Sequence, residues 1–453
     1  MSGTELELAQ RALAAGAPAD GVLATVTRER SLMLRFARSR PTQATAVDDL
    51  SVELTVLRDG HAARAQSNRT DADALRNCAR AATASAEAAA RAAGPGYYPG
   101  FPSPAPARAH DGHDPETARL DAATGGRAMG EAFETAYAAG VEAHGIWTAG
   151  EVTTAIASSE GAAAQDAVTD AFMKVVAIHP DGRSGYAAAT APTVGELRPV
   201  ELAASAAAKA AAPGEPARLP PGEYPVVMEH HAVGLLLDML GGIAFDGLAH
   251  AEGRGALDGR LGTTVAAPAI NLSDSPRFHL TLPRAFDAEG VPKAPLPLIQ
   301  DGVAHRVVHD VRSAALAGAA STGHALAPAG AAGGPRPTNL VLTGGGAASA
   351  EELCRPIERG VFVTRLWYAN VVRRKEALIT AVTRDGTFLI EGGEITRPLH
   401  DLRLTDSALG ILTRTQALGA DVRLTSDGEF YWRRFATGVV CPPLRAGVAR
   451  FTG

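Results

Sequence analysis

The sequence is poor in residues that define several protein classes. Its 453 residues include three cysteines, and Cys78, Cys354 and Cys441 form no CxxC pair. This excludes a zinc ribbon, a CxxC redox motif and a disulfide framework, and it fits a reducing, cytoplasmic compartment. Only 4 of the 43 Lys and Arg residues are lysines, and alanine and glycine are abundant, which indicates the coding bias of a GC-rich bacterial genome.

Aromatic residues, basic charge and long apolar runs are also scarce. Aromatic residues make up 5% of the chain, so the core must depend on Ala, Val and Leu. The net charge of −6 disfavours a general nucleic-acid-binding protein, which needs a basic surface. The longest uncharged stretch, residues 313–335, is interrupted by His324 and Pro328 and is too weakly hydrophobic to cross a membrane. The N-terminus shows no apolar signal segment, so we expect a cytoplasmic protein with no membrane or nucleic-acid partner.

Helix and strand patterns divide the chain into two unlike halves. Helices are predicted over residues 5–15, 71–93, 115–139 and 199–211, and short strands lie between them, among them 21–27 and 31–37. Five prolines and two glycines in residues 212–225 forbid a regular element there. The sequence therefore predicts an N-terminal domain over residues 1–211, a linker over 212–224 and a C-terminal domain over 225–453.

The C-terminal half is richer in strands. One helix is predicted over residues 229–240 and a late one over 406–418, with a series of short strands between and around them, including 279–282 and 304–308. This pattern favours a mostly antiparallel, barrel-like β domain. The predicted fold class is α+β, with an N-terminal mixed sheet carrying helices.

The run Glu229-His230-His231 at the start of a helix is the most suggestive chemical motif. Zinc peptidases place two histidines one helical turn apart, but Gly234 and Leu235 stand four residues after these histidines. Adjacent helical residues diverge by about 100° and seldom bind one ion together. A polar helix N-terminus is therefore the favoured interpretation, and Glu229, His230 and His231 remain weak metal-ligand candidates.

Other motifs carry less chemistry. His305 and His309 have a four-residue spacing, but the alternating residues around them predict a strand, where that spacing is too long for one ion. Cys441 is interpreted as a small buried residue. No G-x-S-x-G nucleophile motif is present. A strand bearing Arg365, Trp367 and Tyr368 is interpreted as core rather than as a peptide groove.

Several longer segments resemble one known family. They are PGEYPVVMEHHAVGLLLDML (residues 221–240), ERGVFVTRLWYANVV (358–372), TRDGTFLIEGGEITRPL (383–399) and PPLRAGVARFTG (442–453). Their order and spacing resemble the TldD/PmbA family, also called peptidase U62 or modulator of DNA gyrase. The resemblance covers nearly the whole chain and implies a two-domain, cytosolic metallopeptidase system that trims peptides as a TldD–TldE heterodimer.

The resemblance also implies which subunit this chain is. In the family, TldD carries a helical HExxxH motif and a cysteine as zinc ligands, and TldE (PmbA) lacks them. The corresponding helix here has neither the His-Glu pair nor the later histidine, and Cys441 lies too close to the C-terminal strand to match the ligand cysteine. The expectation is a PmbA/TldE-like subunit with no catalytic residues and no cofactor of its own, whose TldD-like partner holds the zinc and whose substrate is a peptide.

Two alternatives stay open at this point. One is a divergent active metallopeptidase that binds zinc through some of Glu229, His230, His231, His250 and Cys441. The other is a peptide-binding or scaffold protein without proteolytic function.

Overall fold

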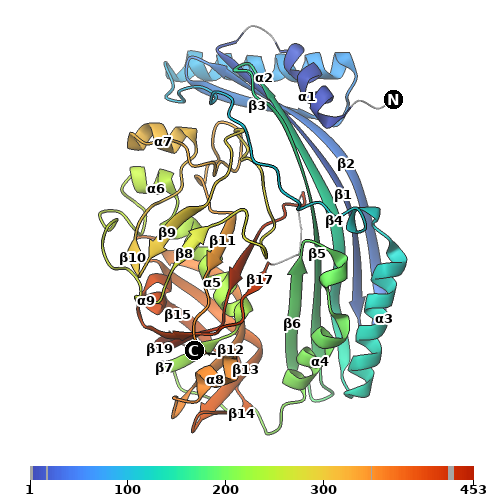
Figure 1. The fold of residues 1–453 in the computed structure, drawn as a ribbon, viewed down its shortest axis with the longest axis vertical. Coiled ribbons are helices and arrows are strands. Elements are labelled where there is room, and N and C mark those ends of the chain that lie inside the picture. Colours follow the sequence, from blue (N-terminus) through green and yellow to red (C-terminus); the bar gives the residue numbers. More distant parts are fainter. Residues whose placement is uncertain (1–3, 17–18, 348, 427–432, 453) are drawn as a thin grey trace.

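The N-terminal half is one large curved sheet with helices on one face (Figure 1). The computed structural model describes residues 4–16, 19–347, 349–426 and 433–452. The six strands run in the order β3-β2-β1-β4-β5-β6, and every pairing is antiparallel. Their bounds are β1 (Gly21–Ala37), β2 (Arg40–Arg58), β3 (His61–Ser67), β4 (Glu142–Ser158), β5 (Ala163–Ile178) and β6 (Ser184–Ala191).

Alternation along β1 determines which face the helices cover. Val22, Ala24 and Val26 belong to the cluster that packs beneath α1 and α2. Leu34 and Phe36, further along the same face, pack with residues of α3 and α4. The helices are α1 (Glu5–Ala14), α2 (Ala72–Ala93), α3 (Ala122–Ala138) and α4 (Pro199–Ala210), with short 3₁₀ turns at Thr117–Arg119 and Val194–Glu196. Since side chains alternate in a strand, the opposite face of β1 is left for the C-terminal half.

The C-terminal half contains a ring of five strands. Pairings join β12 to β7, β7 to β19, β19 to β15, β15 to β13 and β13 back to β12, which gives the barrel-like character expected from the sequence. The β7–β12 pair is parallel and the other four are antiparallel. The bounds are β7 (Gly222–Met228), β12 (Arg359–Arg373), β13 (Leu378–Glu391), β15 (Arg403–Ser407) and β19 (Leu444–Phe451), with β14 (Glu394–Pro398) and β16 (Thr415–Leu418) attached.

A second C-terminal sheet lies beside this ring. It has the order β10-β9-β8-β11-β18-β17, and β11 and β18 run parallel. Its strands are β8 (Leu272–Asp274), β9 (Leu296–Gln300), β10 (Val303–Ala304), β11 (Asn339–Leu342), β17 (Arg423–Thr425) and β18 (Gly438–Cys441). The helices of this half are α5 (His230–Ala244), α6 (Gly247–Ala251), α7 (Val311–Ala317), α8 (Ala350–Cys354) and α9 (Ala408–Thr413).

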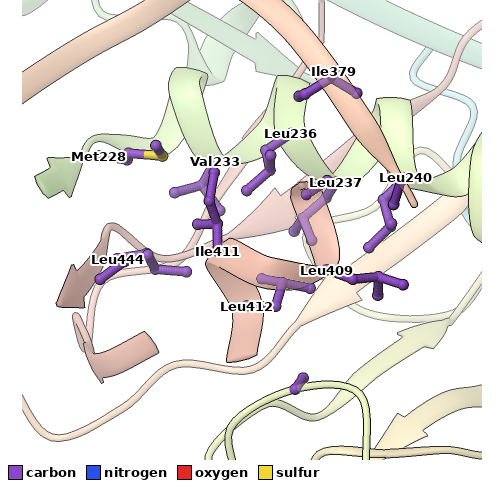
Figure 2. Close-up of a cluster of buried hydrophobic side chains, with 14 of the residues drawn as sticks. Met228, Val233, Leu236, Leu237, Leu240, Ile379, Leu409, Ile411, Leu412 and Leu444 are labelled. Carbon is purple, nitrogen blue, oxygen red and sulfur yellow. The ribbon is translucent and has the colours of Figure 1, made fainter. Parts of the chain in front are cut away.

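Helix α5 is the centre of the C-terminal core (Figure 2). Val233, Leu236, Leu237 and Leu240 are fully buried, and they pack with residues of β13, α9 and β19. A helix that is apolar on most of its circumference is stable only when surrounded by protein. No helix in the described ranges combines the length and the apolar character that crossing a membrane requires.

Most predicted helices and the α+β class are confirmed. The helices expected over 5–15, 71–93, 199–211 and 229–240 correspond to α1, α2, α4 and α5. The helix expected over 115–139 begins only at Ala122, after a 3₁₀ turn. The late helix over 406–418 is wrong in most of its length, because residues on both sides of the short α9 pair with β13 and β19. No strand forms over 279–282, and only Ala304 of the segment 304–308 belongs to one. Strand β7 begins at Gly222, so the prediction of no regular element in residues 212–225 is wrong for the last four of them.

Candidate functional site between the two halves

Three polar residues stand before and at the start of α5, and two of them, Glu229 and His231, bind the N-terminal half. The Glu229 carboxylate lies 2.7 Å from Nζ of Lys209 on α4. His231 donates from Nε2 to the carbonyl of Ala188 on β6, at 3.1 Å. His230 donates from Nε2 to the carbonyl of Asp421, at 3.0 Å. Because the three side chains point to three different partners, they do not converge on one point.

The environment keeps both histidines neutral. Burial, assisted by the charge of Lys209, lowers the pKa of His231 to about 3. The ring of Tyr186 packs edge-on against it, with the ring centres 5.0 Å apart. Burial also lowers the pKa of His230. His231 is therefore a neutral donor across the interface between the halves, and His230 is a neutral donor within the C-terminal half.

The donor set around α5 does not fit a zinc ion. The two histidines of an HExxxH motif are five residues apart. Leu235 stands five residues after His230, and it packs against the hydrophobic core. Cys441 is the one sequence candidate that the structure brings close to His230, and its Sγ donates to the carbonyl of His230, at 3.3 Å. Burial raises the pKa of the Cys441 thiol to about 12, so it is protonated. Among the described residues, no three His, Cys, Asp or Glu side chains are grouped to hold a metal.

The remaining sequence candidates are separated. His305 is exposed, whereas His309 is buried, with Nδ1 lying 3.2 Å from the Ser313 hydroxyl. Nδ1 of His250 is buried and has no hydrogen-bond partner among the residues described. Arg365 is part of the domain interface rather than a peptide groove, since it forms an ion pair with Asp385 and stacks on Tyr186. Tyr368 is exposed.

A cavity of about 270 Å³ lies between the concave face of the N-terminal sheet and the C-terminal half. Its sheet wall includes Thr25 and Thr27 of β1 and Ile156 of β4. The opposite wall comes from the loops around residues 284–293, 323–328 and 433–436. The lining carries five cationic and three acidic side chains: Arg64, Arg284, Lys293, Arg433 and Arg434, and Glu53, Asp166 and Asp287.

A buried Asp–Lys–His cluster supports this wall. Oδ1 of Asp274 lies 3.2 Å from Nζ of Lys293 and 3.2 Å from Nε2 of His324. Oδ2 of Asp274 accepts backbone N–H groups of Thr338 and Asn339, both at 2.8 Å. Burial opposes ionisation of this carboxyl, but the charges of Lys293 and His324 hold its pKa well below the usual range. The carboxylate is therefore ionised, with two cationic partners at ion-pair distance from Oδ1 and two backbone N–H groups donating to Oδ2.

A second buried acidic group lies next to it. Burial and the charge of Asp287 raise the pKa of Glu289 to about 8. Glu289 accepts hydrogen bonds from the Tyr98 hydroxyl, at 3.0 Å, and the backbone N–H of Val311, at 2.9 Å. Burial likewise raises the pKa of Asp287 to about 6, although three backbone N–H groups donate to it.

Arg434 connects the two halves across the cavity. Its guanidinium makes two 2.7 Å contacts with the carboxylate of Asp170 on β5, and it also donates to the hydroxyl of Thr148 on β4. Its backbone N–H donates to Glu29 of β1, at 2.8 Å. Both side chains of the ion pair are almost fully buried.

The sequence analysis did not identify Asp274, Lys293, His324 or Arg434 as interacting residues. Weak signals were present, because Lys293 is one of four lysines and His324 interrupts a long uncharged stretch. Asp170 and Arg434 are 264 residues apart, and no local pattern marks such a pair. Only the fold brings them together.

The fold and this interface define a class of α+β protein in which a curved sheet carrying helices packs against a barrel-like half. Family models describe the same two parts: residues 221–453 match the PmbA/TldA metallopeptidase C-terminal domain, and residues 24–86 match the PmbA/TldA metallopeptidase domain 1. The first match alone spans just over half of the chain. The chain therefore belongs to the PmbA/TldD metallopeptidase family.

Individual relatives are distant. The chain is similar to a metalloprotease of Methanothermobacter thermautotrophicus, with 27% identity over 205 residues, or 45% of this chain and 44% of that protein. It is also similar to a TldD metalloprotease homologue of Haemophilus influenzae, with 25% identity over 231 residues, or 49% and 45% of the two chains. The chain thus spans about half the length of the curated relatives it matches.

Solved structures share the whole fold. A proposed modulator of DNA gyrase from Thermotoga maritima aligns with a TM-score of 0.84 at 22% identity, covering 99% of this chain and 100% of that one. TldE from Thermococcus kodakarensis aligns with a TM-score of 0.84 at 17% identity, covering 99% of both chains. At such identities the likeness concerns the fold.

Proposed function

We propose that this chain is a PmbA/TldE-like subunit of a cytosolic zinc metallopeptidase system that processes peptides. In this proposal the chain holds no zinc, and a TldD-like partner supplies the metal and the hydrolytic step. Family membership and the fold shared with TldE support the proposal.

The observation that carries the proposal is the arrangement at α5. Glu229, His230 and His231 are each engaged by a partner elsewhere in the chain, namely Lys209 and the carbonyls of Asp421 and Ala188. Leu235 packs in the core where a ligand would be needed. A polar N-terminus that holds two domains together is suited to shaping a complex rather than to activating water.

Reconstitution with a TldD-like chain that carries HExxxH tests this proposal. We expect the two chains to form a complex at micromolar concentration, and peptidase activity to require both. Absence of a complex in gel filtration at that concentration would contradict the assignment.

Paired variants separate the roles of the two subunits. Replacing the glutamate of HExxxH in the partner should abolish activity. His230→Asn in this chain keeps an N–H donor for the Asp421 carbonyl and should leave activity unchanged. A loss of activity with His230→Asn, in a complex that still assembles, would instead favour a divergent active site at α5.

A further inference from the structure

We propose that the cavity between the two halves binds the terminal carboxylate of a short peptide, with Arg284 as the anion-binding side chain. In this arrangement Phe286, Phe435 and Ile156 contact the adjoining apolar side chain. The peptide nature of the ligand rests on the proposed function, whereas recognition of the carboxylate rests on the geometry of this chain alone.

Arg284 is a partly buried cation of the lining that forms no ion pair with another described residue. Within the described part of the chain, no carboxylate oxygen lies within 4.0 Å of its guanidinium. Its hydrogen bond goes to the carbonyl of Ala436, at 3.0 Å, and its guanidinium stacks 4.0 Å from the ring centre of Phe435. A guanidinium cannot lose its proton, so the charge of a partly buried arginine favours an anionic partner.

The acidic groups near Arg284 are engaged elsewhere. One oxygen of Asp166 lies 2.7 Å from Nε2 of His110, and the other accepts the backbone N–H of Ala285 at 2.8 Å. Asp274 is paired with Lys293 and His324. The oxygens of Asp287 accept three backbone N–H groups. The N–H groups of the Arg284 guanidinium are therefore not paired with any of these three carboxylates.

Three of the other four cations of the lining already have carboxylate partners, and the fourth, Arg64, is exposed to solvent. Lys293 lies against Asp274, Arg434 against Asp170, and Arg433 lies 3.6 Å from Asp49. One uncompensated guanidinium matches one carboxylate, which it can bind through two parallel hydrogen bonds. A phosphate dianion would need further free cations.

The remaining lining is suited to an apolar group beside that carboxylate. Phe286 and Ile156 belong to one buried hydrophobic cluster at the cavity wall. The Thr25 hydroxyl lies in the sheet wall and has no hydrogen-bond partner in the described residues. The volume equals that of about nine water molecules, which accommodates one or two residues of a peptide.

Calorimetric titration of the full-length chain, without a partner, tests the proposal. The probes are N-acetyl-alanyl-leucine with a free carboxylate, its C-terminal amide and inorganic phosphate. We expect the acid to bind, the amide to bind at least about tenfold more weakly, and phosphate not to compete, since a charge-assisted hydrogen bond contributes roughly a tenfold to hundredfold effect. Equal binding of acid and amide, no binding of the acid, or equal competition by phosphate would each overturn the assignment.

Variants locate the site. Arg284→Gln should lower affinity for the acid to the level of the amide without changing affinity for the amide. Arg284→Lys keeps the charge but cannot donate two parallel hydrogen bonds, so it should bind the acid with intermediate affinity. This variant serves as the test if the glutamine variant does not fold. Arg91→Gln, which removes an exposed cation from α2, is the matched control and should bind like the parent. An unchanged acid affinity in a folded Arg284 variant would contradict the proposal, and none of these results depends on the TldD-like partner.

Discussion

Single buried side chains determine how the stability of this protein depends on pH. The clearest case is Glu289, whose pKa burial and the nearby Asp287 raise from 4.5 to about 8. The native state therefore keeps this proton up to about pH 8, while the unfolded chain loses it above about pH 4.5. Since the unfolded state then binds fewer protons, this group lowers the free energy of unfolding as pH rises, by about 1.4 kcal/mol per unit.

Glu289→Gln removes that dependence. The amide oxygen can accept the Val311 N–H, and the amide nitrogen can donate to the Tyr98 oxygen. We expect similar stability for the variant and the parent at pH 4.5, and a more stable variant at pH 8. Urea unfolding at the two pH values measures this difference, and an unchanged difference between the proteins would contradict the burial of an acidic proton.

His231 produces the opposite slope in acid. Burial lowers its pKa from 6.5 to about 3, so below pH 6.5 the unfolded chain takes up a proton that the native state does not. Stability contributed by this group is fully present above pH 6.5 and is lost as pH falls. His231→Phe keeps the ring contact with Tyr186 but loses the bond to the Ala188 carbonyl. It should be less stable than the parent at pH 7, by about 1–3 kcal/mol, and the gap should narrow at pH 5. A gap that stays constant with pH would show that His231 is not the titrating group.

The sequence indicated the polar start of α5 but not the partners of its residues. The polar start of α5 was visible as Glu229-His230-His231, yet His231 contacts a residue 43 positions away and His230 one 191 positions away. Helical periodicity specifies which residues share a face of one helix, and it carries no information about the element that covers that face.

At the scale of elements, two glycines of α3 allow a matched comparison. A Cβ on Gly125 would lie 2.6 Å from Cδ1 of Leu34 and 2.7 Å from the ring of Trp147, whereas a Cβ on Gly130 would meet no atom within 4 Å. Gly125→Ala should therefore destabilise the protein by about 1–3 kcal/mol, because the helix must move away from the sheet. Gly130→Ala should stabilise it by roughly 0.5–1 kcal/mol through a better helix propensity.

Thermal unfolding of both variants checks the packing of α3 on β1 and β4. The opposite order of the two melting temperatures would contradict the close approach at Gly125. Equal temperatures would mean that this helix does not press against the sheet.

Helices were easier to predict than strands in this chain. Residues 21–27 and 31–37 are predicted as two separate strands, but β1 is continuous through Arg28-Glu29-Arg30. The three charged residues are compatible with a strand because their side chains point to alternate faces of the sheet. Arg28 and Arg30 form ion pairs on the outer face, with Asp48 and Glu151 among their partners. Glu29 points to the interface and accepts the N–H of Arg434.

At the scale of the whole molecule, the ion pair between Arg434 and Asp170 joins the two halves. Arg434→Met leaves Asp170 buried without its cation and should lower the free energy of unfolding by about 3–5 kcal/mol. Adding Asp170→Leu removes the stranded charge and should recover much of that loss. Arg423→Met is the control, since its pair with Asp421 is exposed and should change stability by less than about 1 kcal/mol.

Urea unfolding of the two single variants and the double variant measures the coupling. A double variant that is as unstable as the sum of the single losses would show that the two side chains do not act as a pair.

The central claim is that this member of the PmbA/TldD family contributes structure rather than a metal to its peptidase system. The zinc content of the purified, untagged chain, measured by elemental mass spectrometry without a partner, tests it most directly. We expect essentially no zinc, because Glu229 and His231 bind the N-terminal half and His230 binds the carbonyl of Asp421. About one zinc ion per chain would contradict it and would direct attention to His230, His231 and Cys441 as ligands.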